Sequence, residues 1–247
     1  MHDVKFSTDR LWADCVSMAK AHSSLLIAIG GVFLLLPQFA QSLFFPPPEI
    51  KLLDEDAVNA MSAYFTENAL WFFLLNIPVA LGQAAILTML THPSKPTVGE
   101  ALSKALPFLL FVLVLSFLLN MVLITGYAAL IVPGVYLTGR LAVAAPAQMA
   151  ERIANPFNAI ARSLALTRGN GWQIAGVTIL LVVVGYIIAT AIGAVVGIVL
   201  TFIMPSSVLS AAIALLQSLL AAATLLALLI LSAGLYRQTV EISNKGA

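Results

Sequence analysis

Residues 172–236 read WQIAGVTILLVVVGYIIATAIGAVVGIVLTFIMPSSVLSAAIALLQSLLAAATLLALLILSAGLY and contain no charged side chain. Pro205, Ser206 and Ser207 interrupt this run near its middle, and such residues favour a turn. A helix rises 1.5 Å per residue, so about 20 apolar residues cross the hydrocarbon core of a bilayer. The stretch therefore predicts two membrane crossings, over Trp172–Met204 and Ser206–Tyr236.

The whole chain of 247 residues has a similar composition. It is 61% hydrophobic and 9% charged, whereas soluble domains are about 25% charged. Its mean hydropathy is +1.01. A net charge of +1 gives no global field that would hold nucleic acid. These values exclude a soluble protein and predict one integral membrane domain over residues 1–247, all-α and polytopic, with no nucleic-acid partner.

Charge-poor stretches outside residues 172–236 supply four more predicted crossings. Two are Leu25–Phe45 and residues 69–90. Residues 105–150 contain only one charge, Arg140, and are long enough for two crossings with a turn near residues 127–134, where we expect Pro133 and Gly134 to break the helix. The fourth crossing would then run from about Val135 to Ala150. The prediction is six transmembrane helices.

The basic residues predict the orientation, because Lys and Arg in short loops are retained on the cytoplasmic side. All but one of the twelve lie in flanks of one side or, for Arg140, inside a helix. The exception, Lys51, lies in a mainly acidic loop at residues 46–68. We therefore expect a multi-pass protein of a bacterial inner membrane with both termini in the cytoplasm. The acidic residues that precede Leu25 argue against a cleaved signal peptide.

Three cytoplasmic segments share one design. Each begins at a helix-capping residue: Ser7, Thr97, which forms a capping box with Glu100, and Asn155, which precedes Pro156. The positions five and nine residues after each cap are apolar, namely Trp12 and Val16, Leu102 and Leu106, and Ile160 and Leu164. The pattern predicts three short amphipathic helices on the inner leaflet. It also predicts a pseudo-threefold parallel repeat with units 6–91, 96–150 and 155–237. Alternatively, any cytoplasmic loop that leads into a membrane helix acquires such a pattern.

Residues 131–176 carry a resemblance to a known family. They contain Pro133-Gly134-Val135-Tyr136, then Arg140, Pro146, Ala161-Arg162-Ser163-Leu164, Leu166-Thr167-Arg168-Gly169-Asn170 and Trp172. This series resembles the membrane domain of bacterial glycerophosphoryl diester phosphodiesterases and related YciC-like integral membrane proteins. The resemblance implies a similar architecture. It implies no hydrolase activity, because the catalytic part of those enzymes is a separate soluble domain that nothing here matches.

Catalytic, metal and cofactor chemistry is not expected. The three histidines, His2, His22 and His92, lie in flanks with no ligand spacing or carboxylate cluster. Cys15, the single cysteine, permits no internal disulfide. We find no Ser-His-Asp set, no Cys-His pair and no glycine-rich phosphate loop. We therefore predict no enzyme activity, no metal and no cofactor.

Arg140 is the strongest candidate for a functional residue, because placing a guanidinium inside a membrane helix costs at least about 2.5 kcal/mol on insertion scales. It could bond helix carbonyls or Asn120 in a structural role, bind a lipid phosphate, or line a substrate path. Asn76 and Gln83 project from one face of the second crossing, where interhelical hydrogen bonds are expected. Together Arg140, Asn120, Asn76 and Gln83 form the predicted intramembrane polar cluster or lipid-binding site.

Two further sets are predicted to make contacts. Four small residues at four-residue spacing, which allow close helix packing, lie in the fifth crossing: Gly185, Ala189, Gly193 and Gly197. Their partner is expected to be the sixth crossing, with Ala214, Ser218 and Ala222 at the same spacing, or else another copy or protein. Lipid head-group contact is predicted for the three flanking arginines Arg152, Arg162 and Arg168.

The leading expectation is a non-catalytic inner-membrane protein that scaffolds, stabilises or assembles a membrane complex, or organises inner-leaflet lipid. Its partners would be membrane lipids and either another membrane protein or further copies of itself. The alternative is a carrier or channel-like protein for a lipid or small apolar solute, with Arg140 on the route. A third reading, an enzyme of lipid head groups, would need a site at the cytoplasmic rim. A water- or lipid-filled cavity that reaches Arg140 from one leaflet would favour transport, whereas a tight bundle with Arg140 bonded to neighbouring carbonyls would favour a structural role.

Overall fold

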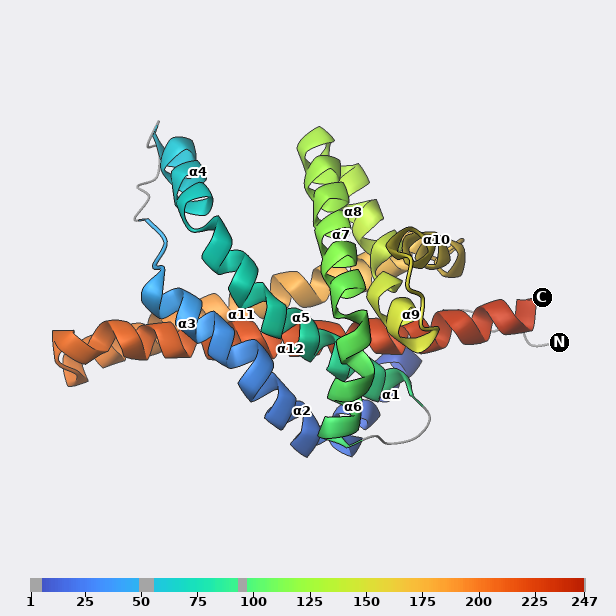
Figure 1. Ribbon diagram of the computed structural model, residues 1–247, viewed down its shortest axis with the longest axis horizontal. Coiled ribbons are helices and arrows are strands. Elements are labelled where there is room, and N and C mark those ends of the chain that lie inside the picture. The colour runs from blue at the N-terminus through green and yellow to red at the C-terminus, as the bar shows by residue number, and fades with distance from the viewer. Residues whose placement is uncertain (1–5, 49–55, 93–96, 247) are drawn as a thin grey trace.

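A computed structural model describes residues 6–48, 56–92 and 97–246 (Figure 1). Those residues form helices and connecting turns, with no strand among them. Within these ranges, five helical segments are long and apolar enough to cross a membrane: Ser23–Phe44, Ala69–Thr91, Val98–Ala129, Gly171–Ile203 and Val208–Lys245. The prediction of an all-helical chain with several membrane helices is confirmed.

The first crossing segment comprises α2 (Ser23–Ile29), the π-helix η1 (Gly30–Leu35) and α3 (Leu36–Phe44). The π turn precedes Pro37, which has no N–H to donate, and the Leu36 N–H donates to the Gly31 carbonyl five residues back. A Cβ built on Gly82 would lie 2.4 Å from Phe33 Cβ. Glycine at position 82 therefore lets the second crossing helix approach this π turn closely.

The second crossing segment follows α4 (Ala57–Glu67) and is the continuous helix α5 (Ala69–Thr91). Pro78 lies inside α5 without ending it. The hydroxyl of Tyr64 in α4 donates to the Phe45 carbonyl at 2.6 Å. This bond ties the end of the first crossing segment to the start of the second.

The third crossing segment comprises α6 (Val98–Ala105), the 3-10 turn η2 (Leu106–Phe108) and α7 (Leu109–Ala129). The chain reverses at Leu130, which has extended backbone, and α8 (Ile131–Leu141) follows. The turn lies inside the predicted range, but Pro133 does not break the helix. It lies in the first turn of α8, where an N–H has no intrahelical partner to lose.

The fourth predicted crossing is not one continuous helix over 135–150. It consists of α8 and a second short helix, α9 (Ala144–Ala150), separated by Ala142 and Val143. Pro146 explains the break, because its ring crowds the carbonyl four residues earlier, that of Ala142, and supplies no N–H to bond it. Neither α8 nor α9 alone reaches the roughly 20 residues that a crossing needs.

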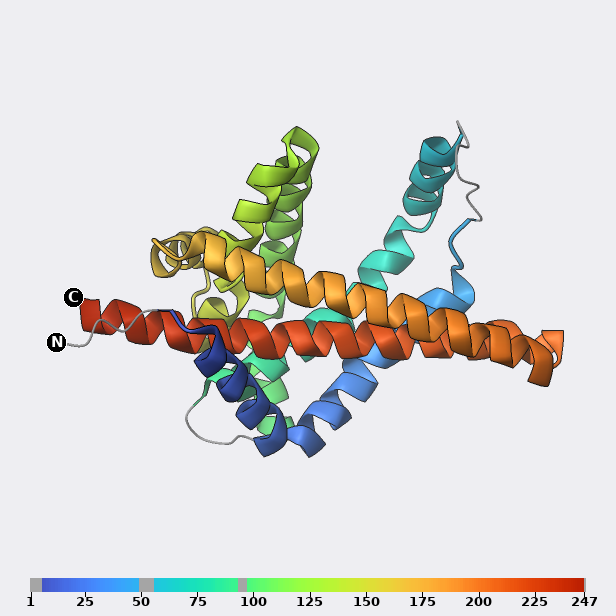
Figure 2. The ribbon, with the colours of Figure 1, turned by 180° about the vertical axis from the view of Figure 1, so that it is seen from behind.

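The last part of the chain comprises α10 (Pro156–Leu166), α11 (Gly171–Ile203) and α12 (Ser206–Gly246). Gly169 has φ +86°, in the left-handed region that favours glycine, and lies in the turn between α10 and α11. The helices α11 and α12 lie side by side as a long antiparallel hairpin (Figure 2).

The helix caps are confirmed by bonds at α1 (Thr8–Ala21), α6 and α10. The Ser7 hydroxyl accepts from the Arg10 N–H at 3.4 Å, and the Asn155 side chain accepts from the Phe157 N–H at 2.9 Å. At α6 both bonds of the capping box between Thr97 and Glu100 form. Sequence alone therefore identified where these helices begin.

The three short helices also bury equivalent positions. The residues four and eight positions after each cap are buried: Leu11 and Cys15 in α1, Ala101 and Ala105 in α6, and Ala159 and Ser163 in α10. The predicted apolar row, one position later, borders the exposed side, and Trp12 is 69% exposed. The buried face of each helix is therefore rotated by one residue from the row read in the sequence.

Each of these three helices packs on a different helix. Helix α1 packs on α12, α6 on α5, and α10 on α9, and α5, α9 and α12 contact one another. We call the meeting point of α5 residues 80–91, α9 and α12 residues 229–239 the central junction. Its side chains are buried or half-buried except that of Arg237, whose guanidinium donates to the Leu90 carbonyl.

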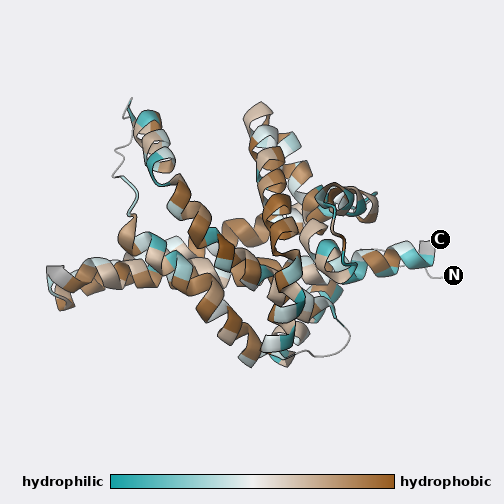
Figure 3. Cartoon of the chain, in the orientation of Figure 1, coloured by the Kyte–Doolittle hydropathy of each residue, from teal (hydrophilic) through white to brown (hydrophobic). Residues whose placement is uncertain are grey.

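Two other segments leave this junction, and we call them the distal arms: residues 57–79 of α4–α5 and residues 116–135 of the α7–α8 hairpin. They diverge from the junction in both views (Figures 1 and 2). No residue of the first arm is buried, and in the second only Gly126 and Gly134 are. Figure 3 shows hydrophobic residues along α5, α7 and α11, and hydrophilic ones at α4, α10 and the C-terminal end of α12.

Candidate functional site

Arg140 lies at the end of α8, where the break before α9 frees its backbone carbonyl. The Ser163 hydroxyl donates to this carbonyl at 2.8 Å and the Thr167 hydroxyl at 3.2 Å. Ser163 lies in α10 and Thr167 caps its C-terminal end, and both are buried. The two hydroxyls supply hydrogen-bond donors to the Arg140 carbonyl at the end of α8.

The side chain of Arg140 contributes to a contact between α8 and α11. Its guanidinium carbon lies 5.9 Å from the Tyr136 ring centroid, a cation–π distance. Tyr136 in turn contacts Trp172, with ring centroids 5.2 Å apart. A Cβ built on Gly139 would lie 2.4 Å from the Gly171 carbonyl oxygen, so only glycine fits there. Arg140 therefore belongs to a packed junction of α8, α10 and α11.

The other members of the predicted polar cluster do not join Arg140. The amide of Asn120 donates to the Ser116 carbonyl at 2.8 Å, and that of Asn76 to the Phe72 carbonyl at 3.2 Å. Both side chains are exposed on the distal arms. Gln83 is half-buried in α5 at the central junction.

Gln148 is a buried polar residue whose partner the sequence did not reveal. Its amide nitrogen donates to the Phe111 carbonyl at 3.3 Å, which joins α9 to α7. Its amide oxygen is buried and finds no hydrogen-bond partner among the residues that the structure describes. No local signal distinguishes Gln148 from the exposed Gln217, because burial depends on packing between distant helices.

The small residues of α11 and α12 face different neighbours. At Gly185 an added Cβ would lie 3.1 Å from Thr224 Cγ2 of α12, whereas at Gly193 and Gly197 it would meet nothing within 4 Å. Ala189 is half-buried. The predicted partner row, Ala214, Ser218 and Ala222, is buried, and the Ser218 hydroxyl donates to that of Ser42 in α3 at 3.4 Å. The row on α12 thus contacts the first crossing segment.

The three flanking arginines have different surroundings. The Arg162 Nε donates to both carboxylate oxygens of Glu151, at 2.8 and 2.9 Å, and the Tyr236 hydroxyl donates to the same carboxylate at 3.0 Å. Arg152 has φ +53° and lies 5.9 Å from the Phe108 ring. Arg168 is exposed. Glu151 therefore joins α10 to α12, a role that the sequence did not reveal.

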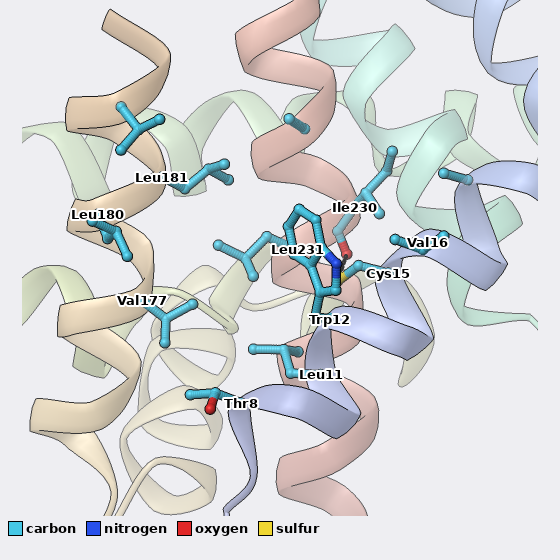
Figure 4. A pocket seen from close by; sticks show the side chains of 13 residues that line it. Thr8, Leu11, Trp12, Cys15, Val16, Val177, Leu180, Leu181, Ile230 and Leu231 are labelled. Carbon is cyan, nitrogen blue, oxygen red and sulfur yellow. Dashed lines mark hydrogen bonds between the residues drawn. The ribbon is translucent and has the colours of Figure 1, made fainter. Parts of the chain in front are cut away.

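A groove of about 420 Å³ lies between α1, α11 and α12 (Figure 4). Apart from Thr8 and Cys15 its walls are hydrocarbon and the Trp12 ring, and Val177 and Leu180 of α11 face Trp12 across it. Arg140 does not line it. Sequence analysis missed this groove because its walls come from helices that are far apart in the chain.

Cys15 lies in this groove but is not poised to react. Its sulfur lies 3.8 Å from the Ile230 carbonyl of α12. Burial, and secondarily the nearby Asp14 carboxylate, raise the pKa of the Cys15 thiol to about 11. The thiol therefore stays protonated at neutral pH and acts as an apolar packing group.

Comparison of the chain with family models, curated proteins and solved structures finds no match.

Proposed function

We propose that this protein is a non-catalytic scaffold of a bacterial inner membrane, whose distal arms bind helices of another membrane protein. The observation that carries the proposal is the pair of exposed amides, Asn76 on one arm and Asn120 on the other. Each amide uses one N–H on its own helix. Within the described residues its oxygen has no partner.

The energetic reason is that a bilayer offers such amides no hydrogen bonds. An exposed Asn in a crossing helix is costly in lipid, and a polar side chain from a neighbouring helix removes that cost. Such bonds average about 0.6 kcal/mol and reach about 1.7. Two of them would change affinity by about sevenfold to about 270-fold, at about 1.4 kcal/mol per factor of ten.

The uneven burial of the crossing segments supports the same proposal. In the segments Ala69–Thr91 and Ser23–Phe44, 33% and 28% of the most apolar window is buried, against 11% in Val98–Ala129 and 0% in Gly171–Ile203. Some helices are thus partly buried in the core of the molecule, whereas others, including α7 of the second arm, are largely exposed. Such a surface suits assembly with other helices better than a closed transport bundle.

The proposed topology has six crossings with both termini in the cytoplasm, the bent pair α8–α9 acting as the fourth. Its support is the ring of contacts in which each short helix packs on the second crossing of another unit, α1 on α12 included. That ring fits the pseudo-threefold repeat of units 6–91, 96–150 and 155–237. The resemblance of residues 131–176 to the YciC-like membrane proteins belongs to the same proposal.

A carrier or channel would need a route that reaches Arg140. Neither the groove nor the second cavity beside it is lined by Arg140. Its carbonyl and side chain instead make the packing contacts described above. We therefore assign Arg140 a structural role within this proposal.

The test is purification from native membranes with both arm amides changed, as Asn76→Leu with Asn120→Leu. The amount of a protein partner that co-purifies with the unchanged chain should fall at least fivefold in the variant, while the variant itself folds normally. The matched control is Val195→Leu, an exposed position on α11. Co-expression of two differently tagged chains tells whether the partner is a second copy. An unchanged set of accompanying proteins, or none with the unchanged chain, would contradict the proposal.

Cysteine labelling tests the topology. With Cys15 changed to Ser, a cysteine at Ser62 of α4 should react with an impermeant maleimide from outside, and one at Arg168 only from the cytoplasmic side. Labelling of both from the same side would contradict the six-crossing arrangement.

A further inference from the structure

The groove between α1, α11 and α12 exists because α1 packs on α12 alone along one face. A Cβ on Gly234 of α12 would lie 2.9 Å from the Cys15 sulfur and 3.1 Å from Leu11 Cδ1, so the two helices are in close contact there. Trp12 and Val16, on the next face of α1, line the space between α1, α11 and α12 without filling it (Figure 4). Because one face of α1 packs on α12, the groove remains open along the neighbouring face of α1.

The groove continues into a polar mouth. A second cavity shares Thr8, Val177 and Leu180 with the groove, and its further lining is Phe6, Ser7, Gln173 and Gly176. The polar residues Ser7, Thr8 and Gln173 thus lie together at this end, beside Phe6, whereas the other end is hydrocarbon. This gradient matches an amphiphile with a polar head and an apolar tail. It does not match a wholly apolar helix from another protein.

The length of the groove matches one leaflet of a bilayer. On α11 the lining runs from Gln173 at the mouth to Val184 at the apolar end. Eleven residues of helix span about 16 Å, which is half of a hydrocarbon core about 30 Å thick. The volume of about 420 Å³ lies within the range of about 300–1,000 Å³ found for small-molecule sites.

The mouth lies at the level expected for lipid head groups. Asp9 and Arg10, beside it on α1, are exposed, as is the ring of Trp12. Amphipathic helices with exposed charges and tryptophan lie at the boundary of head groups and acyl chains. Arg10 is bound to Glu241, so the polar groups left at the mouth are the uncharged ones of Ser7, Thr8 and Gln173.

We propose that this groove is a binding site for one acyl chain of a phospholipid from the leaflet that contains α1, with the lipid's polar head at Ser7, Thr8 and Gln173. The hydrocarbon walls accept the chain, and the hydroxyl and amide groups bond the ester and phosphate oxygens. This site is independent of the partner proposed for the distal arms.

Trp12 provides the direct test in the unaltered groove. Trp71 and Trp172 are changed to Phe, so that Trp12 is the single fluorophore, and the detergent-solubilised protein is titrated with phosphatidylethanolamine brominated on its acyl chains. We expect quenching that saturates near one lipid per chain. Quenching that rises in proportion to the lipid-to-detergent ratio, with no saturation, would show only surrounding lipid and overturn the proposal.

Filling the groove gives the second test. Val184→Phe with Ala227→Leu adds bulk at its apolar end, at side chains that are exposed and half-buried, so the core is not compressed. The matched control is Val182→Phe with Ala223→Leu, at exposed positions of the same helices outside the groove.

Native mass spectrometry of the released protein should show one retained phospholipid on the unchanged and control chains, and at least tenfold less on the filled variant. Equal retention on filled and control chains would overturn the proposal. A dimer lost on filling, with no bound lipid, would show that a second copy occupies the groove and would also overturn it.

Discussion

The central junction and the distal arms are made from the same kind of sequence but differ in what holds them. At the junction, alanines such as Ala84 and Ala85 are fully buried and helices touch through glycine. In the first arm, residues 57–79, nothing is buried. The contrast teaches that hydropathy identifies membrane helices but does not tell which of them pack on one another, because in lipid packing depends on small residues and polar bonds.

The largest effect should come from breaking the contact between α8 and α11. Gly139→Leu places a side chain where a Cβ alone would lie 2.4 Å from the Gly171 carbonyl oxygen. Overpacking costs about 1–3 kcal/mol and more where backbone must move, so we expect at least about 3 kcal/mol lost from the free energy of unfolding in detergent.

Gly193→Leu is the matched control, because an added Cβ there meets nothing within 4 Å. The control should unfold at the denaturant concentration of the unchanged protein. Equal destabilisation by the two substitutions would show that the close contact between α8 and α11 is not the source of stability.

The next effect concerns the Arg140 carbonyl. Changing Ser163 to Ala together with Thr167 to Val leaves that carbonyl buried without its donors, which costs about 1–3 kcal/mol. Thr201→Val removes a hydroxyl that bonds only its own helix on an exposed surface and should be nearly neutral. Unfolding curves of the double variant, the Thr201→Val control and the unchanged protein, measured side by side, give the loss of stability. A neutral double variant would refute the bonding role.

The reactivity of Cys15 tests how deeply α1 is buried against α12. With its pKa at about 11 instead of the usual 9.0, the thiolate fraction at pH 8 is about a hundredfold lower than for an exposed thiol. Alkylation should be slower than at Ser17→Cys in a Cys15→Ser chain, because Ser17 is exposed. The rate should keep rising up to about pH 11. Because the folded state disfavours the thiolate, stability should fall as the pH rises from about 9 to about 11.

The smallest effect is expected for the ion pair between Arg10 and Glu241. Both side chains are partly exposed, at 48% and 31%, and water and salt screen exposed pairs, which contribute little to stability. Arg10→Ala and Glu241→Ala should therefore each lower the unfolding midpoint less than the substitutions above. A double-mutant cycle measured at low and at high salt gives the coupling energy, which salt should reduce. A coupling as large as the loss caused by Gly139→Leu would mean that α1 depends on this pair for its position.

Much of the fold could be predicted from sequence because the signals are local. Length and hydropathy identified the long helices, and Ser7, Thr97 and Asn155 identified the starts of the short ones. The break at Ala142 was missed although Pro146 was visible, because whether proline kinks or ends a helix depends on neighbours such as Ser163. Pro78 lies inside a helix that continues.

The candidate sites depend on contacts between distant segments and were predicted less well. Arg140 was grouped with Asn120 on the expectation that polar residues of adjacent crossings meet. In the structure Asn120 bonds a carbonyl of its own helix, and Arg140 packs on Tyr136. The groove needs α1 beside α11, more than 150 residues later in the chain. The periodicity of a single helix gives no sign of which distant helix will lie beside it.

The contact of α1 with α12 has a consequence for how the molecule is made. The Gln238 amide donates to the Ser7 carbonyl at 3.0 Å, and Arg10 bonds Glu241, so α1 is held by residues that are synthesised 231 positions later. During synthesis α1 must wait at the membrane surface, with its apolar side in contact with lipid, until these residues of α12 have left the ribosome. Synthesis of α12 is thus the event that fixes α1 in place.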